Sequence, residues 1–202
     1  MITETVVLKM MPVIAESRKA IISCNLLRVK SWLALDSALS SETSNLKELH
    51  LTVKTLHLSV ADLKDTEMKS FSALLENPHC KVETLRLWRC GVSDEDCTAL
   101  TSALRLNPSH LRHLDLSINN LGDTGGMILC DILKNPHCKL ETLKLFSCGV
   151  SDKGCTALTS ALRLNPSHLR HLDLSGNKIT DSAKKLLSAL KDETHHRLQT
   201  LM

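Results

Sequence analysis

The chain has 202 residues, 43% of them hydrophobic, which is enough apolar material to bury a sizeable core in one domain. It has only two Trp, two Phe and no Tyr, so leucine must fill that core. The net charge of +3 and the pI near 8.4 are too mild to predict binding to nucleic acid or to a membrane surface. No run reaches the about 18 apolar residues of a membrane-spanning helix. We therefore expect no nucleic-acid partner and no membrane partner.

Residues 1–45 are predicted to be an atypical N-terminal segment, whereas the rest of the chain repeats itself. Glu4 precedes a short apolar run, a pattern that differs from a secretory signal. The first 23 residues do not match the repeat, and we expect them to shield its exposed end, because the terminal units of a stacked array must differ from the inner ones. One degenerate repeat follows, with Trp32, Leu35 and Leu39 at helical spacing.

Residues 46–202 are predicted to form leucine-rich repeats, with an irregularity at residues 46–58. Two strand phrases lie there only seven residues apart, and they consist of Leu46, Leu49 and Leu51, then Val53, Leu56 and Leu58. Either a repeat has lost its helix or one phrase is looped out. We expect the second phrase to be the true strand, and we predict a fault in the stacking near Thr52.

From Val53 onward the phrase L-x-x-L-x-L recurs every 29 residues, at Val82, Leu111, Leu140, Leu169 and Leu198. Residues 83–117 return as residues 141–175, with 30 of 35 positions identical. A period in this range indicates a stacked-repeat architecture, and the phrase is the leucine-rich-repeat signature. Residues 198–202 hold only half of a phrase, which predicts a truncated last repeat. An apolar edge through which the chain could associate is expected there.

Each repeat is predicted to begin with a short strand that ends at a polar turn. Alternation along the strand places Leu85 and Leu87 inward and the residues between them outward. Asn119 and Asn177 follow their strands in alternate repeats, and their side chains can bond backbone groups of the turn.

A helix is predicted to follow each turn. Ser93, with three acids directly after it, has the composition of a helix start. Cys97, Leu100 and Leu104 then form an apolar stripe at helical spacing. A strand and a helix in every repeat predict an α/β fold. Its form would be a right-handed leucine-rich-repeat solenoid shaped like a horseshoe, with parallel strands on the concave face and helices on the convex face.

The eight cysteines are predicted to be reduced packing residues. Cys90 and Cys148 share one repeat position, and Cys97 and Cys155 share another, as buried small hydrophobic residues would. The sequence has no C-x-x-C pair, and its His-Cys dipeptides lack partners at metal-ligand spacing. We expect no metal and no cofactor, and reduced cysteines favour a cytoplasmic protein.

The repeat alternates between two types, one with C-G-V after its strand and the next with N-x-L or N-x-I. Its 58-residue double unit contains N-P-H-C-K-[LV]-E-T-L and W-R-C-G-V-S-D. Over residues 53–202 this pattern resembles the C-terminal repeats of the NOD-like receptors (NACHT and leucine-rich-repeat proteins), which are of the ribonuclease-inhibitor type. The resemblance implies a cytosolic sensing or autoinhibitory arm of an innate-immune receptor. Such a receptor also carries a NACHT module, and the G-x-x-x-x-G-K-[ST] phosphate loop of that module is absent from this sequence.

The outward side chains of the strands form the predicted protein-binding site on the concave face. Two of the four aromatic residues, Trp88 and Phe146, are two strands apart, or about 10 Å. Trp and Arg are enriched at binding hot spots. The alternative is that both aromatics pack on neighbouring strands without a partner. The predicted site residues are Arg86, Trp88, Arg89, His113, Asp115, Lys144, Phe146, His171 and Asp173.

Catalysis is not predicted. His113 with Asp115, and His171 with Asp173, supply two members of a nucleophilic triad, but a nucleophile and oxyanion donors are missing. A solvated or salt-bridged pair is the simpler interpretation. Besides a recognition module, three alternatives stay open: a ribonuclease-inhibitor-like protein, a GTPase-activating leucine-rich-repeat regulator, and a receptor fragment without a role of its own. The first would need a strongly acidic inner wall, and the second an acidic tail that the sequence lacks.

Overall fold

A computed structural model describes residues 4–16, 19–28, 31–32, 34–35, 48–57, 72, 75–76, 82–107, 110–165, 168–193 and 197–202. Its helices and strands alternate from residue 84 onward. In chain order they are α1 (Glu4–Glu16), β1 (Lys19–Arg28), β2 (Glu48–His57), β3 (Thr84–Arg86), α4 (Asp94–Leu106), β4 (His113–Asp115), α5 (Gly122–Lys134), β5 (Thr142–Lys144), α6 (Asp152–Leu164), β6 (His171–Asp173), α7 (Asp181–Asp192) and β7 (Thr200–Leu201).

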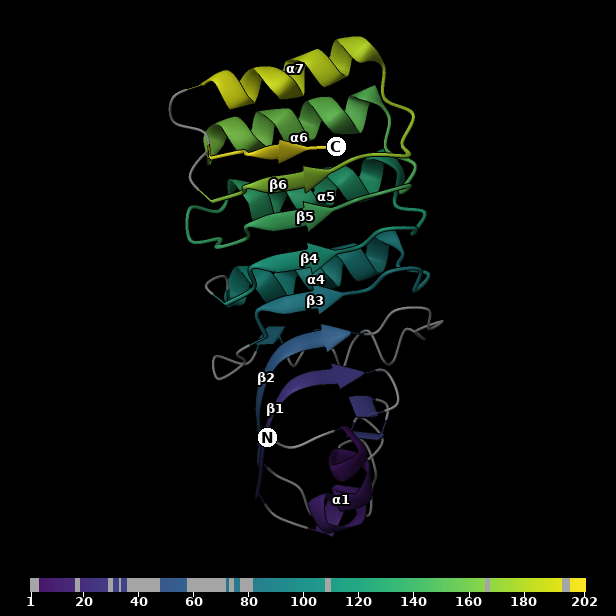
Figure 1. Ribbon diagram of the computed structural model, residues 1–202, viewed down its shortest axis with the longest axis vertical. Coiled ribbons are helices and arrows are strands. Elements are labelled where there is room, and N and C mark those ends of the chain that lie inside the picture. Colours follow the sequence, from purple (N-terminus) through teal and green to yellow (C-terminus); the bar gives the residue numbers. More distant parts are fainter. Residues whose placement is uncertain are drawn as a thin grey trace.

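The seven strands form one parallel sheet in the order of the chain, from β1 to β7. Paired residues in neighbouring strands are 29 positions apart, from Lys19 opposite Glu48 to Leu172 opposite Leu201. Figure 1 shows the strands stacked like rungs, with α4, α5 and α6 in a second layer behind them. The expected α/β leucine-rich-repeat solenoid, with strands on one face and helices on the other, is confirmed. None of the helices in the described ranges is long and apolar enough to cross a membrane.

The N-terminal strands differ from the expected stacking fault near Thr52. β2 includes Leu49 and Leu51 of the first phrase and Val53 and Leu56 of the second, and Thr52 between them pairs with Ser23 of β1. The second phrase pairs with β3, where Thr55 lies opposite Thr84. Ten extended residues span about 33 Å, so the described parts of both phrases lie in one strand without a loop between them, whereas Leu46 and Leu58 lie outside the described residues. The described pairing therefore shows no shift in register.

The extent of β1 also changes the expected N-terminal segment. Residues 4–16 form the helix α1, but residues 19–23, which were expected to shield the end of the stack, belong to the sheet. Trp32 and Leu35 are fully buried, as predicted, whereas Leu39 lies outside the described residues. The division of the chain at residue 45 stays a prediction, because residues 36–47 are not described either.

The inward leucines of the strands form one continuous core with the apolar stripes of the helices. Leu85, Leu87, Leu143 and Leu145 are at most 1% exposed. The predicted stripe of α4, with Cys97, Leu100 and Leu104, is buried in the same cluster, as is its counterpart on α6. Burying one leucine side chain contributes about 1.5–3 kcal/mol, so the repeated leucines are a main source of the stability of the stack.

The turns after β3, β4 and β5 are each held by a side chain from the next repeat. The Asn119 carboxamide accepts from the backbone N–H groups of Cys90 (3.0 Å) and Val92 (3.1 Å). It donates to the carbonyls of Leu87 (2.8 Å) and Leu116 (2.7 Å). Asn177 makes the same four bonds one double unit later. In the repeat between them, the Cys148 thiol donates to the Leu116 carbonyl at 3.2 Å.

The helix starts are capped both within and between repeats. Ser93 caps α4, and it exchanges bonds with Asp96 as in a capping box. The Ser151 cap of α6 donates its N–H and hydroxyl to the Asp123 carboxylate on α5. Thr180, the cap of α7, donates in the same way to Asp152 of α6. Each of these carboxylates therefore fixes the first turn of the next helix.

Among the described residues, the cysteines are free and buried: Cys90, Cys97, Cys130, Cys138, Cys148 and Cys155. Burial raises the pKa of the Cys97 thiol to about 12 and that of Cys148 to about 11. These cysteines are packing residues, as their positions predict. Cys80 and the side chain of Cys24 lie outside the described residues.

Candidate protein-binding surface on the open face of the sheet

The open face of the sheet is the side that the helices leave uncovered, and its residues alternate with the buried leucines. Leu85 and Leu114 are buried, while Thr84, Arg86 and His113 are exposed or half-buried. The 29-residue register aligns equivalent residues of successive strands into rows that cross the sheet. The structure thus places the predicted strand residues side by side.

One row alternates in charge. It consists of Arg86, Asp115, Lys144 and Asp173, each opposite the next in the strand pairing. The two carboxylates are bound locally, because Asp115 accepts from the N–H of Ser117 (3.1 Å) and Asp173 from the N–H of Ser175 (3.0 Å). Arg86 and Lys144 are exposed, and neither forms a hydrogen bond or ion pair with another described residue. The row therefore offers two available cations that alternate with two hydrogen-bonded carboxylates.

A shallow cavity of about 270 Å³ lies among these side chains. Thr84, His113 and Thr142 supply hydroxyl and imidazole groups, while Arg86 and Lys144 stand at its two sides. The lining combines two positively charged donors with neutral donors and acceptors and with the Asp115 carboxylate, which the Ser117 N–H already binds. Such a surface can bind an acidic or polar segment of a partner by hydrogen bonds.

The His–Asp pairs of the sequence are not brought together by hydrogen bonds. The Nδ1 atom of His113 lies 3.0 Å from the Thr142 hydroxyl on the next strand, and Asp115 bonds the backbone instead. Ser117, expected outward, is 4% exposed. A triad needs a nucleophile bonded to a base that is bonded to an acid. His113, Asp115 and Ser117 do not form this chain of hydrogen bonds.

The two aromatic residues lie at the end of the open face where the strands turn. Phe146 is 38% exposed, and Trp88 is half-buried. The Phe146 ring lies so close to Gly176 that a Cβ atom there would come within 2.9 Å of it. One side of the ring therefore packs on the next turn, and the other side is exposed and could contact a partner.

Arg89 occupies the turn rather than the strand. It has φ of 52°, and the equivalent residues Ile118, Ser147 and Gly176 have φ of 56°, 50° and 71°. Only glycine adopts this left-handed conformation without cost. The exposed Arg89 side chain consequently lies at the rim of the open face, beside the aromatic residues.

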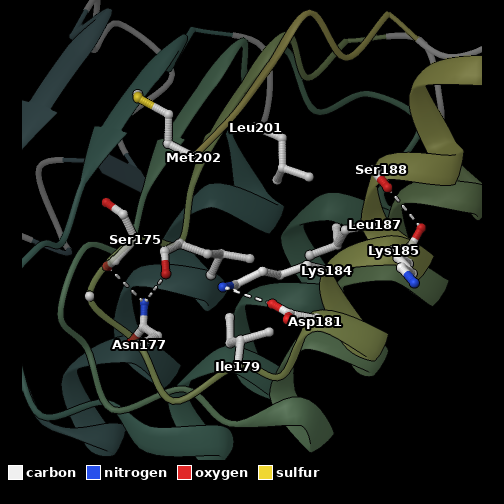
Figure 2. Close-up of a pocket in the computed structure, with 12 residues that line it drawn as sticks. Ser175, Asn177, Ile179, Asp181, Lys184, Lys185, Leu187, Ser188, Leu201 and Met202 are labelled. Carbon is white, nitrogen blue, oxygen red and sulfur yellow. Dashed lines mark hydrogen bonds and ion pairs between the residues drawn. The ribbon is translucent and has the colours of Figure 1, made fainter.

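A second hollow lies at the C-terminal edge, between β7 and α7, with a volume of about 650 Å³. Figure 2 shows Ile179, Leu187 and Leu201 around it, with Lys184 paired to Asp181 at 3.6 Å. Asp181 is in register with Asp123 and Asp152, which cap the next helix in the inner repeats. At this edge, Asp181 therefore occupies the position from which Asp123 and Asp152 bind the next repeat.

Sequence reasoning treated the acidic residues of the helix starts as local charges and missed this role between repeats. Asp94, Asp123, Asp152 and Asp181 recur at 29-residue spacing, which was the available signal. The spacing alone could not predict the contacts between repeats. Asp94 has the same spacing, but the helix that follows in the next repeat, α5, begins after Leu121 and has no side-chain cap.

Comparison with known proteins agrees with this geometry. A model described as "Leucine Rich repeat" matches residues 107–130, 137–158 and 165–185. A solved structure of leiomodin-1 actin-binding site 2 superposes with a TM-score of 0.59 at 17% identity, covering 69% of this chain and 79% of that one, which shows the shared fold alone. The chain is a leucine-rich-repeat protein.

The repeats are homologous to those of two groups of curated proteins. NACHT, LRR and PYD domains-containing protein 14 of Mus musculus is 38% identical over 83% of this chain and 17% of its own length. The corresponding protein 12 of Mus musculus is 38% identical over 87% of this chain and 16% of its own length. Ribonuclease inhibitor of Mus musculus is 37% identical over 63% of this chain and 28% of its own length. This leucine-rich-repeat protein spans less than a third of each relative.

Proposed function

We propose that this leucine-rich-repeat protein is a non-catalytic, cytoplasmic module that recognises another protein through the open face of its sheet. The observation that carries the proposal is the pair of exposed cations, Arg86 and Lys144, which line the same open cavity on this face. Trp88 and Phe146 at the adjacent rim would supply the apolar anchors that interfaces need. Homology to the NACHT, LRR and PYD proteins supports a sensing or autoinhibitory role in innate immunity.

The alternative of a ribonuclease-inhibitor-like function has a specific observation in its favour, namely the 37% identity to that inhibitor. The charge row argues against it, because Arg86 and Lys144 offset Asp115 and Asp173 instead of leaving a strongly acidic wall. Activity of a basic ribonuclease in the presence of excess chain distinguishes the two. Undiminished ribonuclease activity is expected, and stoichiometric inhibition would replace our proposal.

The direct test is quantitative capture from cytosolic lysate, read by mass spectrometry, with the native chain and the variant Trp88→Ala/Phe146→Ala as baits. The matched control is Leu106→Ala/Leu164→Ala, which removes two residues that are each 71% exposed on the helical side. All baits must show equal thermal melts by circular dichroism. We expect partners held by the native chain and the control to be lost by the aromatic variant, with about 1 kcal/mol or more lost per anchor. Equal capture by all three would refute the site.

The C-terminal edge is the second surface that we propose for association, and its occupant would be a further leucine-rich repeat. The support is positional, since Asp181 is in register with Asp123 and Asp152, and the Leu174 carbonyl is in register with those of Leu116 and Leu145, all of which bind the next repeat. A synthetic peptide that copies residues 145–173 is the probe, and a scrambled peptide is the control. Amide shifts confined to residues around Lys184 and Leu187 are expected for the first peptide alone.

A further inference from the structure

Two columns of side chains run across the sheet beside the N-terminal ends of the strands. The first column alternates in charge and consists of Glu83, Arg112, Glu141, Arg170 and then Gln199. Its successive members are joined by backbone hydrogen bonds of 2.7–2.8 Å, from Arg112 N–H to Glu83 and on to Gln199 N–H to Arg170. The second column lies two residues earlier in each repeat and contains His110, Lys139, His168 and Arg197. It carries no acid.

In the inner repeats the first column balances its own charge. Arg112 donates through Nη1 to Glu141 Oε1 at 2.5 Å. Burial raises the pKa of Glu141, but the bond from Arg112 and the nearby Arg170 outweigh it and hold the pKa below its ordinary value. Glu141 is thus an ionised carboxylate whose closest partner is Arg112.

The alternation breaks at the last position. Gln199 is equivalent to Glu141 in the 58-residue unit, so a neutral amide stands where the pattern places a carboxylate. Arg170 therefore has an occupied acid on one side and no acid on the other. Neither Arg170 nor Arg197 forms an ion pair with any residue that the structure describes. The C-terminal end of the first column therefore carries an excess of positive charge.

Further basic groups and a cavity adjoin this excess. Arg170, Arg197, Leu198 and Gln199 line an open cavity of about 400 Å³. Lys139 Nζ lies 3.4 Å from His168 Nε2. Burial lowers the pKa of His168, and Lys139 and Arg197 lower it further, as a local excess of cations must. We define the basic corner as Lys139, His168, Arg170, Arg197 and Gln199.

We propose that the basic corner binds a phosphate group, with Arg170 and Arg197 as its two forks and Gln199 as a neutral hydrogen-bond partner. Arginine presents paired N–H donors in the geometry of phosphate oxygens, and two arginines match a dianion in charge. The occupied Glu141 limits the site to the side of Arg170 that faces Gln199. This site lies beside the strand starts, apart from the aromatic rim, and does not depend on the function proposed for the open face. The phosphate could belong to a small molecule or to a phosphorylated side chain of a protein.

The test is a titration of the full chain with inorganic phosphate at constant ionic strength, followed by ¹H–¹⁵N NMR of backbone amides and arginine side chains. Saturable shifts are expected at Arg170, Arg197 and Gln199. Arg197→Gln should weaken binding about tenfold, as loss of a charge-assisted hydrogen bond does. Arg105→Gln, which removes an exposed cation from α4, is the matched control and should leave binding unchanged. Equal weak shifts at all cations would overturn the proposal.

Gln199→Glu is the sharper variant, because it restores the Glu–Arg alternation of the inner repeats and should preserve folding. It is expected to abolish phosphate binding at an unchanged melting temperature, and retained binding would contradict the site. Phosphoserine and a phosphoserine peptide then identify the source of the phosphate. Tighter binding of the peptide assigns a phosphoprotein, whereas equal binding assigns a small molecule.

Discussion

Replacing Asn119 by alanine removes four hydrogen bonds of 2.7–3.1 Å at once, together with a longer one of 3.4 Å to the Ser117 carbonyl. The side chain is 4% exposed and serves the N–H groups of Cys90 and Val92 and the carbonyls of Leu87 and Leu116. Leu116 keeps a partner, because the Cys148 thiol also donates to it. Three backbone groups would be left without their partner in a buried turn.

An unsatisfied buried polar group costs about 1–3 kcal/mol, and water that enters the vacated space offsets part of this. We therefore expect Asn119→Ala to lower the free energy of unfolding by about 3–5 kcal/mol. Asn177→Ala should cost less, since Asn177 makes the same bonds from a half-buried position that water reaches.

Urea unfolding followed by far-ultraviolet circular dichroism measures both values, provided that the slope with denaturant is unchanged. Asn120→Ala is the matched control, because it makes the same substitution at the adjacent, exposed residue. Exposed substitutions usually change stability by about 0.5 kcal/mol or less. A loss for Asn119→Ala no larger than that of the control would refute the reasoning, and it would mean that the turns are held by leucine packing alone.

Three further results are expected. Ser147→Gly should raise the free energy of unfolding in urea by about 0.5–1 kcal/mol, because it relieves a φ of 50° at an exposed turn; a decrease would contradict the strain. The Ser151 hydroxyl and N–H lower the pKa of the Asp123 carboxyl in the folded chain. Because the unfolded chain then binds more protons in acid, these hydrogen bonds stabilise the fold above pH 3.8, and their contribution is lost as the pH falls through the lowered pKa. Melting temperature against pH should accordingly fall less steeply in acid for Asp123→Asn, and an unchanged slope would count against the cap. The buried thiols, with the Cys97 pKa raised to about 12, should react with a disulfide reagent at mildly alkaline pH only after unfolding, and rapid labelling of the native chain would exclude their burial.

Much of the fold follows from the sequence because the repeat is periodic. A 29-residue period fixes which residues are neighbours across the sheet, so the inward leucines, the buried helix stripe and the Asn119 turn are all predictable from position. The helix start at Ser93 follows from local chemistry alone. The N-terminal strands were less predictable. Two phrases seven residues apart suggested a lost helix or a looped-out phrase, and only the pairing of Thr52 with Ser23 shows that one strand passes between them.

The sequence by itself determined which side chains lie on the open face, but only the tertiary structure decided which of them are available. The sequence suggested that His113 and Asp115 form a pair. In the structure, the imidazole lies within hydrogen-bond distance of Thr142 on the next strand, and the carboxylate accepts from a backbone N–H of the following turn. Arg86 and Lys144 have no such neighbour among the described residues and stay exposed. Periodicity specifies position along the chain, whereas hydrogen bonds between repeats depend on distances of a few ångströms that the sequence does not contain.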